Sequence, residues 1–250
     1  LSIALGLGTA VSALVPLLGG IFIARTGFQT FFLLPLPLMF IMFFILGRCR
    51  NIPVQRTSWK EGKKLISNLG AKIHLAEASV VYPLNIGWLF TVYFYTQNKM
   101  AIVGGIVTFG MVVQVVYQLW LGKLVDRGAG REVAHIAGAM RFIQAIAKAV
   151  LPLSLPGVLG LEALTGATNV HHGLVQPTVM YNAGKKSADT FWYWLFAETA
   201  FDLGTILGAV PVALLLLSGV PLRLTLLVAL PGILAVWWLT YRYFHKLRIY

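Results

Sequence analysis

Two carboxylates, Glu198 and Asp202, interrupt an otherwise apolar stretch of the sequence, LFAETAFDLG at 195–204. Residues four apart on a helix share one face, so the two side chains would point in the same direction. Neighbouring carboxylates in apolar surroundings hold protons more strongly than in water, which makes this pair a candidate proton carrier. Such acids can equally be structural, and Arg141 is the cation that could neutralise Glu198.

Two adjacent histidines, His171 and His172, stand in the segment TNVHHGLVQP at 168–177. Adjacent residues on a helix point about 100° apart, so at most one of the two rings is expected to face a water-filled cavity. A histidine there can titrate near neutral pH or hydrogen-bond a substrate. The alternative is a hydrogen bond that joins its helix to a neighbouring one.

Three amide side chains, those of Asn85, Gln114 and Gln118, also lie within long apolar segments. Gln114 and Gln118 are four apart, so they share a helix face and could line the same cavity. Hydrogen bonds between packed helices are the other common use of such amides. The amides, the two histidines, Arg141 and the carboxylate pair together form the candidate pathway for substrate and protons.

The elements that must carry these residues are membrane-spanning helices. Hydrophobic residues make up 58% of the sequence and charged residues only 11%, whereas about 25% of a soluble domain is charged. A spanning helix needs roughly 20 mostly apolar residues, and a transmembrane strand would alternate in polarity. The segment LLVALPGILAVWW at 226–238 is apolar on every side, so we expect an all-α transmembrane bundle. Eight spans are predicted, at about 1–23, 29–47, 75–96, 101–121, 133–152, 158–181, 190–217 and 222–244.

Two further acids, Glu77 and Glu162, lie within roughly one helical turn of a predicted span end. Side chains at such positions can reach water, so these two acids are not included in the predicted pathway.

The net charge of +12 is distributed unevenly over the connections between the spans. If the connections alternate across the membrane, fifteen Lys and Arg residues fall on one side and three, Arg25, Lys99 and Arg223, on the other. Basic residues gather on the cytoplasmic side of membrane proteins, which places the larger set in the cytoplasm. No loop interleaves basic and aromatic residues as a nucleic-acid-binding module does. The sequence therefore predicts an integral protein of a bacterial inner membrane, or of a eukaryotic plasma or organelle membrane.

One connection, residues 48–74, is much longer than the others and holds seven Lys or Arg and one Glu. We interpret it as a cytoplasmic linker between the last two helices of one bundle (1–47) and a six-helix bundle (75–250). The chain opens inside an apolar span, without Met, charged leader or cleavage site, so we expect a fragment of a longer protein. Cys49, the single cysteine, cannot form an internal disulfide.

A charged, glycine-rich cluster, GKLVDRGAGR at 122–131, lies in a short connection on the predicted cytoplasmic side. It resembles the G-x-L-x-D-R-x-G-R signature of the major facilitator superfamily of secondary transporters. The matching residues are Gly122, Leu124, Asp126, Arg127 and, displaced by one position, Gly130 and Arg131. PLLGG at 16–20 also resembles the end of the G-P-x-x-G-G motif of many exporters in this superfamily. The resemblance implies a twelve-helix transporter fold, of which this chain would cover approximately helices 5–12.

The physical properties of this cluster favour a gate independently of the resemblance. Glycines let helix ends approach closely, and Asp126, held near an Arg or a helix N-terminus, can form a contact in one conformation and lose it in another. We therefore predict a cytoplasmic gate at residues 122–131. The alternative is an ordinary charged turn that fixes the topology.

Enzymatic function is not expected, because G-x-S-x-G, H-E-x-x-H and G-x-x-x-x-G-K-[ST] motifs are all missing from the sequence. No second His or Cys stands at metal-ligand spacing, so neither a metal nor a cofactor is predicted. The favoured function is a secondary transporter that moves a small solute by alternating access, with protons as the expected coupling ion. Two alternatives stay open. One is a polytopic enzyme acting on lipid through His171, Glu198 and Asp202, and the other is a non-transporting receptor or scaffold of the same fold.

Overall fold

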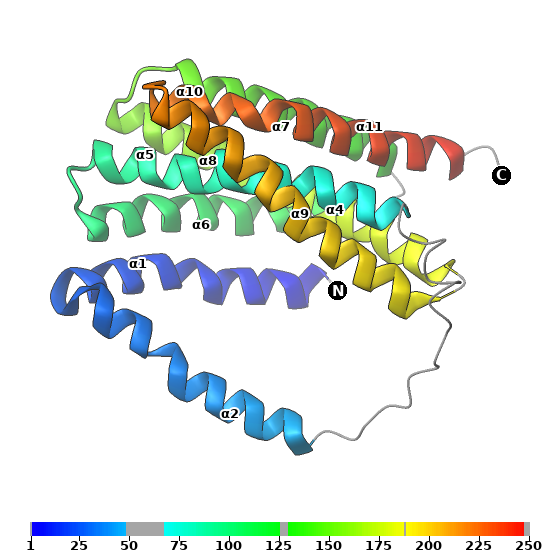
Figure 1. Cartoon of the computed structure of the whole chain (residues 1–250), viewed down its shortest axis with the longest axis horizontal. Coiled ribbons are helices and arrows are strands. Elements are labelled where there is room, and N and C mark those ends of the chain that lie inside the picture. Colours follow the sequence, from blue (N-terminus) through cyan, green and yellow to red (C-terminus); the bar gives the residue numbers. More distant parts are fainter. Residues whose placement is uncertain (1, 49–67, 126–129, 188, 248–250) are drawn as a thin grey trace.

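The chain folds into long helices that lie side by side along one axis (Figure 1). The structure, a computed structural model, describes residues 2–48, 68–125, 130–187 and 189–247. Every secondary-structure element in these ranges is helical, which confirms the predicted all-α class. In chain order the elements are α1 (Ser2–Leu33), α2 (Pro35–Arg48), α4 (Leu69–Val80), a π-helical turn η1 (Val81–Ile86), α5 (Gly87–Tyr95), α6 (Met100–Val125), α7 (Gly130–Val150), α8 (Leu155–Lys185), α9 (Thr190–Leu217), α10 (Leu222–Thr225), a 3₁₀ turn η2 (Leu226–Ala229) and α11 (Leu230–Leu247).

Six segments of the described chain are long and apolar enough to cross a membrane, so the prediction of eight spans is wrong in number. The six are Ser12–Arg48, Leu69–Tyr95, Met100–Leu121, Arg131–Val150, Thr190–Leu217 and Leu222–His245. The runs predicted at 1–23 and 29–47 lie within one apolar segment, although Gly27 between them has non-helical backbone angles (φ 81°, ψ 166°) that kink α1. The run predicted at 158–181 lies in α8, whose many polar side chains lower its hydropathy and leave it outside the six.

The six apolar segments indicate an integral membrane protein. Much of their apolar surface is exposed: no described residue of α2 is buried, and Phe40 of α2 and Leu217 of α9 are 75% and 85% exposed. Monomeric soluble proteins rarely expose an apolar surface of this extent to water. In a bilayer the same surface can contact lipid tails or further helices.

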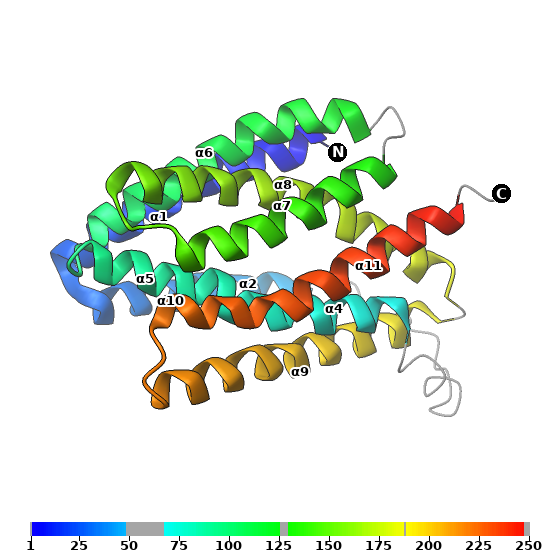
Figure 2. The ribbon, with the colours of Figure 1, turned by 90° about the horizontal axis from the view of Figure 1, so that it is seen from above.

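The helix ends gather at two opposite ends of the bundle (Figures 1 and 2). The linker end holds the end of α2, the start of α4, the α6–α7 and α8–α9 connections and the end of α11. The hairpin end holds the α5–α6, α7–α8 and α9–α10 connections. Exposed Lys185 and Lys186 lie at the linker end, whereas Lys99 lies at the hairpin end. The six helical segments after residue 68 therefore alternate in direction, as the sequence predicted.

At both ends of the bundle, side chains form hydrogen bonds with backbone groups that are left free at helix ends. At the linker end, Asn68 is the N-cap of α4, and its side-chain oxygen accepts a 2.6 Å hydrogen bond from the Ala71 N–H. At the hairpin end, the Arg223 guanidinium donates to the carbonyl oxygens of Lys148 and Leu151, where α7 ends. A cation at a helix C-terminus also interacts favourably with the helix dipole.

α1 packs closely along α6, which joins the first two helices to the rest of the bundle (Figure 1). Pro16 lies inside α1 and has no N–H to donate to the helix. On α6, the Thr108 hydroxyl accepts from the adjoining Leu17 N–H at 3.2 Å and donates to the Ala13 carbonyl at 2.8 Å. Gly104 lets the two backbones touch, because a Cβ there would meet the Pro16 carbonyl oxygen.

A π-helical turn divides the helix that carries part of the candidate site. Pro83 stands within this turn, η1, and cannot donate to the helical ladder. Such a turn shifts the register between the helical segments on either side of it, here α4 and α5, and is frequent near functional sites. Asn85 lies in the turn and Trp88 just beyond it.

Candidate binding site

A row of polar side chains runs along the buried face of α7. Arg141, Gln144 and Lys148 are 5%, 1% and 0% exposed, and their spacing of three and four residues places them on one helix face. A second polar row on α8 faces them; its members are Glu162, Thr165, Thr168 and His172. We call these two rows the α7–α8 seam. Polar groups inside a membrane are costly, so each requires a partner or a function.

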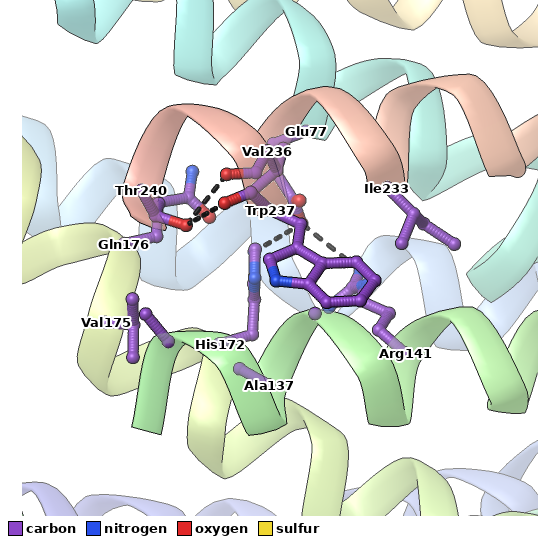
Figure 3. A pocket seen from close by; sticks show the side chains of 12 residues that line it. Glu77, Ala137, Arg141, His172, Val175, Gln176, Ile233, Val236, Trp237 and Thr240 are labelled. Carbon is purple, nitrogen blue, oxygen red and sulfur yellow. Dashed lines mark hydrogen bonds and ion pairs between the residues drawn. The ribbon is translucent and has the colours of Figure 1, made fainter. Parts of the chain in front are cut away.

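One part of the seam is an ionic cluster of Glu77, Arg141 and His172 (Figure 3). Arg141 Nη2 lies 3.2 Å from Glu77 Oε1, and His172 Nε2 lies 2.8 Å from the same oxygen. The angle at His172 Nε2 does not suit a hydrogen bond, so this second contact is an ion pair when the ring is protonated. The three residues come from α4, α7 and α8, and the cluster therefore ties three helices together.

A small cavity of about 20 Å³ lies beside the ionic cluster, between α7, α8 and α11. The Trp237 indole covers it (Figure 3), and Gly138 makes room for this ring because a Cβ there would meet the indole. The volume suffices for a water molecule but not for a solute. The ionic cluster is thus suited to holding helices together or handling protons, and not to binding a substrate.

The middle of the seam is a closed hydrogen-bond bridge. Gln144 Nε2 donates to Thr165 Oγ1 at 2.9 Å, and Gln144 Oε1 accepts from Thr168 Oγ1 at 3.0 Å. Both ends of the buried amide are thereby satisfied, as buried polar groups require. This bridge fixes α7 against α8.

At the hairpin end of the seam, Trp88 contacts two opposite charges. Its Nε1 donates a 2.7 Å hydrogen bond to Glu162 Oε2, and the Lys148 ammonium lies over its ring face, with Nζ 4.8 Å from the ring centroid. The Lys148 ammonium is fully buried and has no hydrogen-bond partner among the described residues. Lys148 and Glu162, both within the described ranges, do not form an ion pair with each other, and the acid that pairs with Arg141 and His172 is Glu77.

These charges line a cavity of about 300 Å³ between α5, α6, α7 and α8. This volume lies at the lower limit of ligand pockets, which measure roughly 300–1,000 Å³. The polar side chains in its wall are Asn85, Gln114, Lys148, Glu162, Thr165 and Asn169. The apolar part of the wall includes Leu89, Val92, Val107 and Met111. We call it the Lys148 cavity.

The predicted pathway residues divide between the two sites. Asn85 and Gln114 line the Lys148 cavity, and their amides make no hydrogen bond within the described ranges. Gln118 is buried one turn further along α6 and is not part of that wall. His172 belongs to the ionic cluster, and the side chain of His171 lies outside the described part of the structure.

The predicted pairing of Arg141 with Glu198 is wrong, because Arg141 contacts Glu77 instead. Glu198 and Asp202 lie on an exposed face of α9, away from the α7–α8 seam. They are on one helix and four residues apart, as the sequence predicted. Their role as a proton carrier stays a prediction.

The expectation that Glu77 and Glu162 reach water is also wrong, because their side chains are buried. Both helices begin before the predicted span boundaries. α4 starts at Leu69 and not at 75, and α8 starts at Leu155 and not at 158, so each acid lies deeper than a single helical turn.

The charged motif at 122–131 lies at the linker end, where α6 ends and α7 begins. Arg131 Nη2 donates a 2.6 Å hydrogen bond to the Tyr241 hydroxyl of α11, and its guanidinium carbon lies 5.1 Å from the centre of that ring. The side chains of the other motif residues lie outside the described part of the structure; these residues are Gly122, Leu124, Asp126, Arg127 and Gly130. The gate therefore stays a prediction.

Lys148 and Glu162 are not among the site residues that the sequence predicted. A usable signal was present: Arg141, Gln144 and Lys148 recur at the helical period inside an otherwise apolar span, which marks one buried polar face. The contact of each charge with Trp88 had no such signal, because it depends on how far the Trp88 side chain reaches from α5 toward Lys148 of α7 and Glu162 of α8.

Comparisons with protein-family models, with curated proteins and with solved structures give no match to this chain. Within the ranges that the structure describes, no group of three or more His, Cys, Asp or Glu side chains could hold a metal ion.

Proposed function

We propose that the protein is a secondary active transporter that moves a small solute by alternating access, with the Lys148 cavity as part of its binding site. The observation that carries this proposal is the Lys148 ammonium. It is fully buried, has no hydrogen-bond partner among the described residues, and lines a cavity inside a bundle of apolar helices. Charged side chains inside apolar bundles are costly, and those retained there commonly mark substrate or ion pathways.

The motif at 122–131 supports the same proposal. Its resemblance to the major facilitator signature leads us to propose that fold, with the chain covering approximately helices 5–12. The linker end would then face the cytoplasm, and the distribution of basic residues agrees with this orientation. The close packing of α1 on α6 joins the two helices before the linker to the six-helix unit after it.

Proton coupling is the second part of the proposal, and we assign it to Asp202. In the described structure neither Asp202 nor Glu198 has an ion-pair partner, and both lie on a surface that bilayer or further helices must cover. Carboxylates within apolar spans commonly belong to proton pathways. Asp202→Asn keeps the shape but cannot titrate.

The test is solute flux in proteoliposomes that contain the purified protein and a pH-sensitive dye. At least one class of solute, among amino acids, organic acids, amines and sugars, should cross the membrane only when the protein is present. Asp202→Asn should abolish accumulation driven by a pH gradient while exchange of the same solute continues. Flux of none of these solutes would contradict transport, and lipid turnover in the same vesicles would identify an enzyme instead. Accumulation that survives Asp202→Asn would exclude this residue as the proton carrier.

A further inference from the structure

We propose that the Lys148 cavity binds a small zwitterion with an apolar side chain, of the amino-acid class. This inference deepens the proposed transport function and rests on it for the role of the cavity. It is carried by the juxtaposition of a buried ammonium and a buried carboxylate that share one cavity without forming an ion pair with each other.

The ammonium of Lys148 supplies the anion-binding end. The side chain is fully buried, and the face of the Trp88 indole is its only aromatic contact, with Nζ 4.8 Å from the ring centroid among the described residues. A ring face stabilises a cation weakly compared with a hydrogen-bonded anion, because no charge is neutralised. A ligand carboxylate beside Nζ would supply the hydrogen-bonded anion that Lys148 lacks among the described residues.

The carboxylate of Glu162 supplies the cation-binding end. Its Oε2 accepts from Trp88 Nε1 at 2.7 Å, and its Oε1 accepts no hydrogen bond from the described residues. The bond to Trp88 fixes the orientation of the carboxylate, since α5 holds the indole against α8. A ligand ammonium can therefore donate to Oε1 without displacing an existing partner.

Charge balance distinguishes a zwitterion from a simple anion or cation. Lys148 and Glu162 carry opposite charges, so the two groups together are neutral. A monoanion would satisfy Lys148 but add a second negative charge near Glu162, and a monocation would do the reverse. Interactions between charges are strong where the dielectric constant is low, so a ligand with both charges is the one that this cavity favours.

The rest of the cavity wall indicates the size and character of the ligand. The volume of about 300 Å³ suits a small solute, and one side of the wall is made by Leu89, Val92, Val107 and Met111. An aliphatic side chain would bury apolar surface there. The amides of Asn85, Gln114 and Asn169 make no hydrogen bond with the described residues, so they can complete the hydrogen bonds of a ligand carboxylate and ammonium.

Binding is tested with three ligands of closely similar shape that differ in charge: leucine, 4-methylpentanoate, which lacks the amine, and isoamylamine, which lacks the carboxylate. The readout is the thermal stabilisation of the purified protein in detergent, which does not require transport. Leucine should stabilise the protein, and the two singly charged analogues should do so at least about tenfold more weakly, because each lacks one charged hydrogen bond. Equal stabilisation by either analogue, or no response to leucine, would overturn the proposal.

Two variants locate the binding site. Lys148→Met and Glu162→Gln should each weaken the leucine response at least about tenfold, while Lys185→Met, which removes an exposed lysine at the linker end, should leave it unchanged. An unchanged response in a folded Lys148→Met protein would overturn the assignment. If that variant does not fold, the comparison of the three ligands on the unmodified protein still decides the ligand class.

The two proposals fail in different ways. Leucine stabilisation without solute flux in proteoliposomes would support the ligand class and contradict transport. Flux of another class of solute, with no stabilisation by leucine, would contradict the ligand class and leave transport supported.

Discussion

Arg141 Nη2 lies 3.2 Å from Glu77 Oε1, and both side chains are buried inside the bundle. The contact crosses from α7 to α4, between residues that are 64 positions apart in the sequence. Because His172 approaches the same Glu77 oxygen, one carboxylate compensates two basic side chains. Glu77 is therefore the anion on which this part of the bundle depends.

Glu77→Gln should strongly destabilise the protein, because it leaves Arg141 buried without a counter-charge. Loss of one partner of a buried ion pair costs about 3–5 kcal/mol. The free energy of unfolding can be measured by denaturation in mixed micelles. Glu198→Gln is the matched control, and because Glu198 is exposed it should change stability by no more than about 0.5 kcal/mol. Equal losses in the two variants would contradict the assignment of Glu77 as the partner of Arg141.

Trp88→Phe should lower stability by about 1–3 kcal/mol, because it removes the Nε1 donor to Glu162 while keeping an aromatic face for Lys148. The measurement is again unfolding in mixed micelles. Trp120→Phe, at a position that is 57% exposed on α6, serves as the control for loss of an indole. If both variants lose the same stability, the hydrogen bond between α5 and α8 makes no net contribution.

Gly104→Val should separate α1 from α6, because a Cβ at this position would meet the backbone oxygen of Pro16. Forcing extra atoms into a packed interface costs about 1–3 kcal/mol. The neighbouring Gly105 is a close control, since a Cβ there would meet nothing within 4 Å. Valine has the same helix propensity at both positions, so the difference in stability between the two variants measures the α1–α6 contact. No difference between them would show that α1 does not depend on this close approach.

Much of the fold follows from the sequence, because long apolar runs and the charges that separate them are local features. The number of spans was less predictable. Composition locates helix ends only roughly, so it does not show whether the runs at 1–23 and 29–47 form one apolar segment or two. The run in α8 is long enough to span a membrane, but its polar side chains lower its hydropathy. The partner of a buried charge was the least predictable feature. Depth along a helix suggested Glu198 for Arg141, whereas the packing of α4 against α7 and α8 brings Glu77 to it.

The candidate site was likewise predictable from the sequence only in part. The sequence identified Asn85 and Gln114 because amides are rare in apolar runs, and both line the Lys148 cavity. Lys148 and Glu162 lie near span ends in the sequence, which made them resemble ordinary interfacial residues. Only the arrangement of α5, α7 and α8 around Trp88 shows that the two charges share a cavity.

The orientation in the membrane gives the last prediction, which uses single cysteines in a Cys49→Ser background. Lys99→Cys and Ser218→Cys lie in two exposed connections at the hairpin end, and Lys186→Cys lies in an exposed connection at the linker end. The excess of basic residues at the linker end predicts that this end faces the cytoplasm. A membrane-impermeant maleimide added to intact cells should therefore label positions 99 and 218 at once, and position 186 only after the membrane is opened. Because all three positions are exposed in the structure, a missing label reports the side of the membrane and not burial. Labelling of position 186 alone in intact cells would reverse the orientation, and it would also place the motif at 122–131 on the outer side, where it could not be a cytoplasmic gate.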